Sequence, residues 1–188
     1  MDLIKNIWNT KDANIILKKS KDHGNLWLGN AKAALDLNYL VDNNISVIIN
    51  CSVDIPYIYD ILEPQELCKN KICLNLETFR IPVFDSLLPH DLYLMEQYFP
   101  KVLPFIIQKL ITEKKNVFIG CFAGKQRSAI VVAALLYILK EKGSDQESKN
   151  ESMKQVIQFI VKCRPQAFRY GYKINFKQSL ENYFKINI

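Results

Sequence analysis

Cys121 and Arg127 are the residues whose types and spacing could carry chemistry together. Five residues separate them and form a candidate loop: Phe122, Ala123, Gly124, Lys125 and Gln126. A short loop folded around a phosphate can direct successive backbone N–H groups at its oxygens, and Gly124 permits the positive φ that such a loop needs. A guanidinium binds two phosphate oxygens with its planar fork, and a thiol in such a positive field loses its proton readily. Cys121 is therefore a candidate nucleophile toward phosphorus, and the intervening residues, with Arg127, are candidates for binding the phosphate.

The segments on either side of this loop strengthen the interpretation, because the spacing alone is a weak signal. Residues 116–120 are typical of a buried strand, and residues 128–140 are typical of a buried helix. Ligands of parallel sheets bind where strands end, and a helix N-terminus adds N–H donors for an anion. The alternative is that Cys121 is an inert buried thiol at a strand end and that Arg127 is an ordinary solvated charge.

The elements that must position this loop alternate along the chain. Helical patterns separate most of the extended segments, which lie at residues 26–28, 46–50, 71–76, 80–83 and 116–120. This alternation predicts an α/β fold with a central, mainly parallel sheet of about five strands, flanked by helices on both faces. In the helical pattern at residues 91–112, Asp91 is well placed as the N-cap. Pro100 and Pro104 are expected to kink or divide that helix.

Composition limits the partners and the compartment. The 188 residues carry a net charge of +6, which favours anionic partners (phosphoproteins, phosphoinositides, RNA or a membrane surface) or simply solubility. The five cysteines show no zinc-binding spacing, so neither a disulfide framework nor a metal site is expected. The N-terminus lacks the pattern of a signal peptide, and the apolar stretch at residues 129–139 is too short to cross a bilayer. We therefore expect an intracellular, cytoplasmic protein with free thiols.

The loop and its flanks resemble a known family. Cysteine, five residues, arginine and then Ser128 are similar to the signature loop of the protein tyrosine phosphatase superfamily. The flanks resemble the dual-specificity branch of that superfamily at residues 26–30, 47–51, 81–86, 161–165 and 175–180. The resemblance runs from about residue 25 to residue 184 and implies the α/β fold of these phosphatases. We expect an N-terminal extension over residues 1–24 and a dual-specificity phosphatase catalytic domain over residues 25–188.

The resemblance implies a role for each matching residue. Cys121 corresponds to the nucleophile that forms a cysteinyl-phosphate, and Arg127 to the residue that binds the oxygens of the substrate and the transition state. Ser128 corresponds to the hydroxyl that hydrogen-bonds the sulfur and helps it leave. Asp85 corresponds to the general acid that protonates the leaving oxygen and then acts as a base toward water. Otherwise Asp85 is a turn or capping aspartate, and Asp91 is the second candidate for the acid. No metal ion or organic cofactor is expected.

Three positions bear on how closely the chain follows the family. Gly120 stands where the family usually has the histidine that orients the loop. Lys125 resembles a basic loop residue of lipid phosphatases of the phosphatase-and-tensin type, but the second basic position of that pattern is Phe122 here. The same lipid phosphatases have a cysteine in the place of Cys51 that can pair with the oxidised nucleophile. Cys51 is therefore a candidate redox partner of Cys121, and the alternative is an inert core thiol.

Three functions follow from these patterns. The first is a protein phosphatase for phosphotyrosine and phosphoserine or phosphothreonine, because the chain lacks a tyrosine-recognition insertion and a shallow cleft is expected. The second is a phosphatase for phosphoinositides or the 5′ end of RNA, which Lys125 favours. The third is a phosphate-binding pseudophosphatase with weak activity, which Gly120 favours. Monomer and homodimer are both open. A basic and aromatic patch, which contacts substrate or RNA or is a solvated face, contains Arg164, Arg169, Tyr170, Tyr172 and Lys173.

Overall fold

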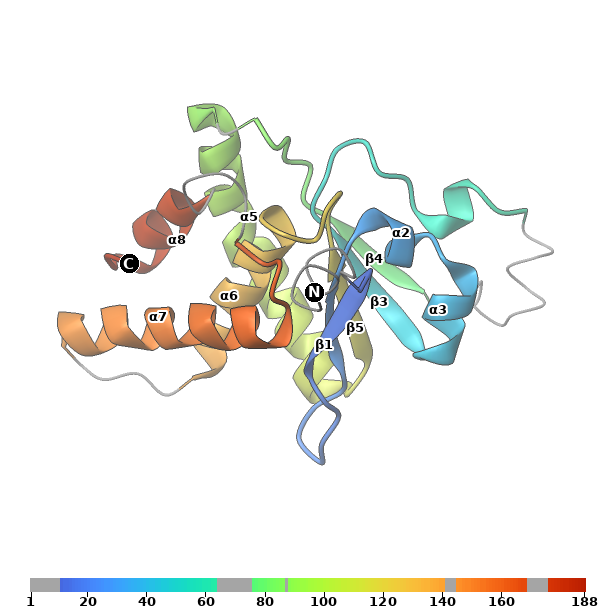
Figure 1. Cartoon of the computed structure of the whole chain (residues 1–188), viewed down its shortest axis with the longest axis horizontal. Coiled ribbons are helices and arrows are strands. Elements are labelled where there is room, and N and C mark those ends of the chain that lie inside the picture. Colours follow the sequence, from blue (N-terminus) through green and yellow to red (C-terminus); the bar gives the residue numbers. More distant parts are fainter. Residues whose placement is uncertain (1–10, 64–75, 87, 141–144, 169–175) are drawn as a thin grey trace, which may run out of the picture.

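The fold is organised around one sheet, and in this computed structural model the described residues are 11–63, 76–86, 88–140, 145–168 and 176–188. The sheet has five strands in the order β1-β2-β5-β3-β4 (Figure 1). β1 pairs antiparallel with β2, whereas β2 with β5, β5 with β3 and β3 with β4 are parallel pairs. The predicted central, mainly parallel sheet is confirmed. The strands are Ala13–Leu17 (β1), Leu26–Gly29 (β2), Ile45–Asn50 (β3), Glu77–Arg80 (β4) and Asn116–Gly120 (β5).

Helices flank the sheet on both faces, as predicted (Figure 1). Two short helices, α2 (Ala31–Ala34) and α3 (Leu37–Asp42), pack on one face within the described ranges. A single 3₁₀ turn, η1 (Ile58–Asp60), follows β3, and a π-helical turn, η2 (Gln108–Thr112), continues α5. None of the described helices is both long enough and apolar enough to cross a membrane. The helices of the second face are α5 (Pro89–Ile107), α6 (Arg127–Leu139), α7 (Gln146–Cys163) and α8 (Lys177–Phe184).

The central strands separate two hydrophobic cores, because successive side chains of a strand point to opposite faces. In β5, Val117 and Ile119 belong to the core with α5 to α8, and Phe118 belongs to the core with α2 and α3. A strand that is buried on both faces has a continuous apolar sequence, which is why β5 is easily recognised. β5 lies between β2 and β3. The loop that follows β5 is therefore placed among the loops that follow its neighbours.

The first strand lies inside the segment that the sequence indicated as an N-terminal extension. Ala13–Leu17 forms β1 and pairs with β2, with an irregularity in the register between Ile15 and Leu17. Residues 1–24 are thus more than an appendage, because part of them forms an edge of the sheet. The domain boundary at residue 25 stays a prediction. The strand expected at residues 71–76 falls outside the described ranges, except for its last residue.

Two expectations for the long helix at residues 91–112 were wrong, the N-cap at Asp91 and a division of the helix at Pro100 or Pro104, whereas a kink at these prolines stays a prediction. α5 begins at Pro89 with Leu88 as its N-cap residue, so Asp91 lies inside the first turn and does not cap the helix. α5 also runs without interruption through Pro100 and Pro104. A proline inside a helix costs about 3 kcal/mol, but the helix buries Phe99 and several neighbours in the larger core. Tertiary packing therefore outweighs the local preference.

Candidate active site

The candidate nucleophile lies at the carboxyl end of β5, where the sequence placed it. β5 ends at Gly120, and α6 begins at Arg127. The Cys121 side chain is buried, with 3% of the residue exposed. The Ser128 hydroxyl, in the first turn of α6, donates a hydrogen bond to the Cys121 sulfur over 3.2 Å. The structure therefore brings these two predicted residues together, and the hydroxyl can stabilise negative charge on the sulfur.

Backbone carbonyls of the loop accept hydrogen bonds from residues outside the loop. The Phe122 carbonyl accepts from the Ala31 N–H at 3.1 Å, and the Lys125 carbonyl accepts from the Phe168 N–H at 2.8 Å. In a trans peptide, the carbonyl and the next N–H point in opposite directions. Carbonyls that point away from the loop centre therefore direct the following N–H groups toward it. Such inward N–H groups form an anion-binding nest.

Gly124 is required by its surroundings and by its backbone angle. Its φ is +63°, which L-residues with a side chain rarely adopt. A Cβ atom at this position would lie 2.4 Å from the Gly29 carbonyl oxygen and 2.7 Å from Arg164 Nη2. The loop thus packs directly against the end of β2 and against a buried arginine. The sequence-based expectation of a positive φ at Gly124 is confirmed.

Arg127 is buried, with 5% of the residue exposed. Its Nη1 donates to the Val83 carbonyl at 2.9 Å, and its Nη2 lies 3.8 Å from a carboxylate oxygen of Asp85. Its buried Nε has no hydrogen-bond partner within the described part of the chain. A buried polar group without a partner is rare in native structures. An oxyanion held by the loop would supply that partner with a charge-assisted hydrogen bond. The solvated-charge alternative for Arg127 is wrong.

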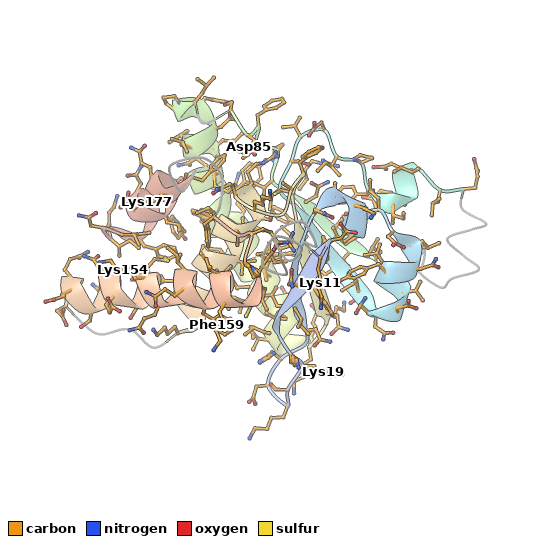
Figure 2. All side chains as sticks on the ribbon, viewed as in Figure 1. Lys11, Lys19, Asp85, Lys154, Phe159 and Lys177 are labelled. Atoms are coloured by element: carbon orange, nitrogen blue, oxygen red, sulfur yellow. The ribbon has the colours of Figure 1, made fainter. Side chains whose placement is uncertain are left out.

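Asp85 follows β4 and reaches the same site as Arg127, with its side chain partly exposed to solvent. It lies at the end of the molecule opposite Lys19, which marks the far turn of the β1–β2 hairpin (Figure 2). Asp91 has a different place. It is buried and accepts hydrogen bonds from the Phe84 N–H, at 3.3 Å, and from the Ser86 hydroxyl. Asp91 therefore supports the loop that carries Asp85, and its burial argues against its role as the alternative acid.

A neighbouring aromatic side chain explains why position 120 is a glycine. A Cβ atom on Gly120 would lie 2.6 Å from a ring carbon of Phe118, and one on Gly29 would lie 2.5 Å from the same ring. The buried Phe118 ring therefore lies against both glycines at the ends of β2 and β5. No larger side chain fits at position 120 unless this ring moves. The Phe118 ring thus accounts for the glycine at the position where the family usually has a histidine.

Cys51 lies beside the candidate nucleophile. Its residue is fully buried, and its N–H donates to the Gly120 carbonyl at 2.7 Å, which continues the pairing of β3 with β5. Burial raises the pKa of the Cys51 thiol well above its ordinary value; a charge on Cys121 raises it further, and Arg127 opposes this. Cys51 is therefore a neutral thiol at physiological pH. Among the described cysteines, Cys51, Cys121 and Cys163 are free.

Sequence reasoning missed Arg164 as part of the site. The sequence grouped it with a basic surface patch, yet it is buried with only 1% exposed. Its Nε donates to the Gly124 carbonyl at 2.7 Å. A charged residue at the end of an amphipathic helix gave no sign of burial, although the Arg164–Pro165 pair belongs to the segment that carries the family resemblance. The other residues of that patch lie outside the described ranges.

The described residues contain no cluster of three or more histidine, cysteine or acidic side chains that could hold a metal ion. The arrangement found here relies on other groups: a buried thiol, a buried guanidinium and inward N–H groups at the carboxyl end of a parallel sheet. This combination is that of a cysteine-based phosphatase.

Comparison with known proteins agrees with that class. Residues 26–186 match the family described as dual specificity phosphatase, catalytic domain. The chain belongs to the dual-specificity phosphatase family, and the resemblance seen in its sequence is confirmed. A search of curated protein sequences found no match.

Solved structures show the same fold. A crystal structure of DUSP15 is 25% identical, with a TM-score of 0.57, and the match covers 84% of this chain and 81% of that one. Human DUSP28 is 18% identical with a TM-score of 0.60, over 93% of this chain and 94% of that one. PTPMT1 in complex with PI(5)P is 18% identical with a TM-score of 0.57, over 93% of this chain and 96% of that one.

Proposed function

We propose that the chain is a protein phosphatase that hydrolyses phosphotyrosine and phosphoserine or phosphothreonine through a cysteinyl-phosphate intermediate. The observation that carries the proposal is the buried Arg127 guanidinium, whose Nε has no partner within the described residues, in the same loop as a buried thiol. Such a site offers a phosphate the donors that it needs. It also provides a sulfur nucleophile at the base of those donors.

The first chemical step transfers the phosphoryl group to sulfur. The Cys121 thiolate attacks phosphorus, the bond between phosphorus and the leaving oxygen breaks, and the Asp85 carboxyl group gives its proton to that oxygen. The loop N–H groups and Arg127 stabilise the charge on the equatorial oxygens. Asp85 lies beside Arg127 at 3.8 Å, so it stands at the edge of the phosphate position.

The second step regenerates the Cys121 thiolate. Water attacks the cysteinyl-phosphate, and the Asp85 carboxylate accepts a proton from that water. The sulfur–phosphorus bond breaks, and inorganic phosphate and the Cys121 thiolate are released. The Ser128 hydroxyl, at 3.2 Å from the sulfur, stabilises the departing thiolate. No metal ion or organic cofactor takes part in either step.

The rim of the site supports a protein substrate. Large hydrophobic side chains are exposed on the loops that follow β3, β4 and β5, including Val53, Phe84, and Phe122 with 69% exposed. Exposed apolar side chains that gather in one place commonly mark a binding surface. The exposed Asp54 and the carboxylate of Asp85 lie in the same loops, and negative charge there disfavours a polyanion. A phosphorylated residue with apolar neighbours in its peptide fits this rim.

A second candidate is a phosphatase for phosphoinositides or for the 5′ end of RNA. Lys125 in the loop favours it, as does the net charge of +6. PTPMT1, which shares the fold, has been crystallised in complex with PI(5)P. Phe122 instead favours a protein substrate, because it is apolar at the position where the lipid phosphatases have their second basic loop residue.

Release of phosphate tests the proposal directly. Wild type and Cys121→Ser are compared on an aryl phosphate, on phosphopeptides, on phosphoinositides and on 5′-triphosphorylated RNA. We expect activity that depends on Cys121, with the highest kcat/KM on phosphopeptides whose phosphorylated residue has apolar neighbours. A preference for phosphoinositide or RNA would favour the second candidate. If wild type equals Cys121→Ser on every substrate, the chain is a phosphate-binding pseudophosphatase.

The role of Asp85 is tested by its pH profile. Asp85→Asn removes the proton donor but keeps the size of the side chain. We expect kcat to fall by roughly 10²–10⁴-fold on a substrate with a basic leaving group, with less loss on an activated aryl phosphate. We also expect the limb of the pH profile that reports the acid to disappear. An unchanged profile would remove Asp85 from the mechanism.

We also propose Cys51 as the redox partner of Cys121. Hydrogen peroxide oxidises the Cys121 thiolate to a sulfenic acid and is itself reduced to hydroxide, which takes a proton from solvent to give water. The Cys51 thiol then attacks the sulfenic sulfur, a disulfide forms, and a second water leaves that carries the thiol proton and the sulfenic oxygen. The two buried cysteines follow paired positions, Asn50 and Gly120, at the ends of β3 and β5. Mass spectrometry after peroxide treatment should detect a Cys51–Cys121 peptide, and Cys163→Ser should leave it unchanged. Its absence would leave Cys51 as a core thiol.

The domain boundary, the cytoplasmic location and the oligomeric state stay predictions. Size-exclusion chromatography with light scattering separates monomer from homodimer.

A further inference from the structure

We propose that Arg164, Phe168 and residues 11–14 form a brace that positions the catalytic loop, the segment from Cys121 to Arg127. The brace contacts the side of the loop that carries its carbonyl oxygens. The inference rests on the proposed function, because its consequence is the binding of phosphate by that loop. Arg164 and Phe168 contact the carbonyl oxygens of the loop, and the segment at residues 11–14 contacts Arg164, so each acts through the backbone of the loop. The brace makes the N-terminal segment part of the site's support.

The brace contacts three successive carbonyls of the loop. Arg164 Nε donates to the Gly124 carbonyl at 2.7 Å, and Nη2 lies 3.4 Å from the Ala123 carbonyl. The Phe168 N–H donates to the Lys125 carbonyl at 2.8 Å. Since each carbonyl opposes the next N–H along the chain, these contacts turn the N–H groups of Gly124, Lys125 and Gln126 toward the loop centre.

The other side of the guanidinium is held by the N-terminal segment. Arg164 Nη1 donates to the Asn14 side-chain oxygen at 2.8 Å and to the Lys11 carbonyl at 3.1 Å. Gln166 reinforces the contact by donating to the same Lys11 carbonyl at 3.1 Å. The segment thus fixes where the guanidinium lies. It is itself fixed to the end of β2 by Asp12, whose carboxylate accepts from Asn30 at 2.9 Å.

The brace also adds positive charge beneath the loop. Burial lowers the pKa of Arg164 to about 10, while charges on Cys121 and Asp12 raise it. Arg164 therefore keeps its charge at neutral pH. The groups that solvate this charge are mostly carbonyls and one amide oxygen. A carboxylate in their place would neutralise it and weaken the field that an anion in the loop experiences.

Phe168 stores strain at the same place. Its φ is +61°, a conformation that is uncommon for a bulky residue. Strained backbone persists where the surrounding contacts determine it, and it gathers at functional sites. Here the contact is the Phe168 N–H on the Lys125 carbonyl. The segment that follows α7 is thus held against the loop.

The family match covers residues 26–186, so residues 11–14 precede it. The support of the loop in this chain therefore extends beyond the part that defines the family. A substitution in β1 should therefore lower the affinity of the loop for phosphate although the sequence of the loop is unchanged.

The test measures phosphate binding without relying on catalysis. Inorganic phosphate bound in the loop protects Cys121 from a neutral alkylating reagent, iodoacetamide, and the phosphate concentration that halves the alkylation rate gives its Kd. Asn14→Ala removes one acceptor from Arg164. We expect this variant to raise the phosphate Kd about fivefold, because one hydrogen bond to a charged group is lost, and Arg164→Lys to raise it more than tenfold.

Asn25→Ala is the matched control. Asn25 lies in the same β1–β2 hairpin, and its side chain accepts from the Lys19 N–H at 2.7 Å, at the end away from the loop. We expect its phosphate Kd to equal that of wild type, at a thermal stability similar to that of Asn14→Ala. If both alanine variants change the Kd equally, or neither changes it, the brace is overturned while the phosphatase proposal stands. If phosphate does not protect the wild type, the phosphate site and the brace both fall.

Discussion

The catalytic loop and the loop that carries Asp85 each have a buried charged side chain behind them, Arg164 and Asp91, and these two charges have opposite sign. Arg164 lies behind the catalytic loop and binds its carbonyls. Asp91 lies behind the Asp85 loop and accepts from the Phe84 N–H and the Ser86 hydroxyl.

The difference follows from what each loop has to present. A buried cation that binds carbonyls directs the N–H groups that follow them toward an anion. A buried carboxylate that binds N–H and hydroxyl groups fixes a loop without placing further donors around the acid. The sign of the buried support therefore matches the task that we propose for the loop above it, phosphate binding for the loop after Cys121 and proton transfer for the loop that carries Asp85.

The largest expected effect comes from filling the space between Arg164 and the catalytic loop. In Gly124→Ala, the added methyl group meets the Gly29 carbonyl and Arg164, and φ is unfavourable. We expect kcat/KM to fall by about 10²-fold or more, since inward N–H donors are displaced, with a loss of about 1–3 kcal/mol in the free energy of unfolding. Steady-state kinetics and denaturant unfolding measure these quantities.

Gly24→Ala serves as the control for Gly124→Ala. Its added methyl group would lie 2.0 Å from the carbonyl oxygen of Lys115, which precedes the start of β5, whereas the catalytic loop follows the end of that strand. We expect lower stability but unchanged activity per folded molecule. Equal losses of activity in both variants would mean that stability alone explains the effect.

The second prediction separates the two loops by their kinetic signatures. Asp91→Ala removes the acceptor beneath the Asp85 loop but leaves the phosphate-binding loop intact. We expect kcat to fall by roughly 10–100-fold, a part of what a general acid contributes, with little change in KM or in the phosphate Kd. The exposed Asp42→Ala on α3 is the control. A rise in the phosphate Kd with unchanged kcat would reverse the roles of the two supports.

The third prediction concerns the entrance to the catalytic loop. Gly120→His restores the family's residue, but its side chain collides with Phe118. Overpacking of this kind costs about 1–3 kcal/mol of unfolding free energy. Combining it with Phe118→Ala should give a smaller loss than the sum of the two single variants, because the pair shares one space. Additive losses in a double-mutant cycle would show that the contact does not determine the glycine.

The smallest effect is expected at a partly exposed ion-pair cluster on the surface, where opposite charges neutralise each other. Lys109 lies 2.8 Å from Glu113 and 2.7 Å from Glu77, and Lys115 lies 2.6 Å from Glu113. Hydrogen bonds from Lys109 and Lys115 lower the pKa of Glu113 to about 2. Since this pKa is depressed on folding, its stabilising effect is present above the ordinary value near 4.5 and is lost as pH falls toward 2.

Glu113→Gln should therefore lower the denaturant midpoint slightly at pH 7, and the difference from wild type should vanish as pH approaches 2. Exposed pairs contribute little and are screened by salt, so high salt should also reduce the difference. A difference that persists at low pH would assign the effect to packing.

Local sequence signals were sufficient for the central part of the fold and the loop. The strand before Cys121, the helix after Arg127 and Gly124 between them all follow from neighbours in the chain, and the structure agrees. The contact of Phe118 with Gly120 was also accessible, because residues two apart in a strand share a face. The sequence analysis did not use that relation.

The supports beneath the loops could not be predicted in the same way. Arg164 meets the loop across 40 residues and meets Asn14 across 150 residues. Such contacts depend on which strands pair and on where α7 ends, and neither is encoded near Arg164. Asp91 had the sequence position of a helix cap, but the helix begins at Pro89 and the carboxylate serves the preceding loop. The contacts of both residues are therefore determined by tertiary structure.

β1 occupies an edge of the sheet, with β2 as its one neighbour there. An edge strand has half the pairing of an interior strand and therefore detaches at lower free energy than the centre of the sheet. On gentle heating, the first strand should leave before β5 or α6 melts, and the sulfur would then lose its ordered surroundings in a molecule that is still largely folded. Inactivation and unfolding of this protein are thus expected as two separate events, with a window of temperature between them.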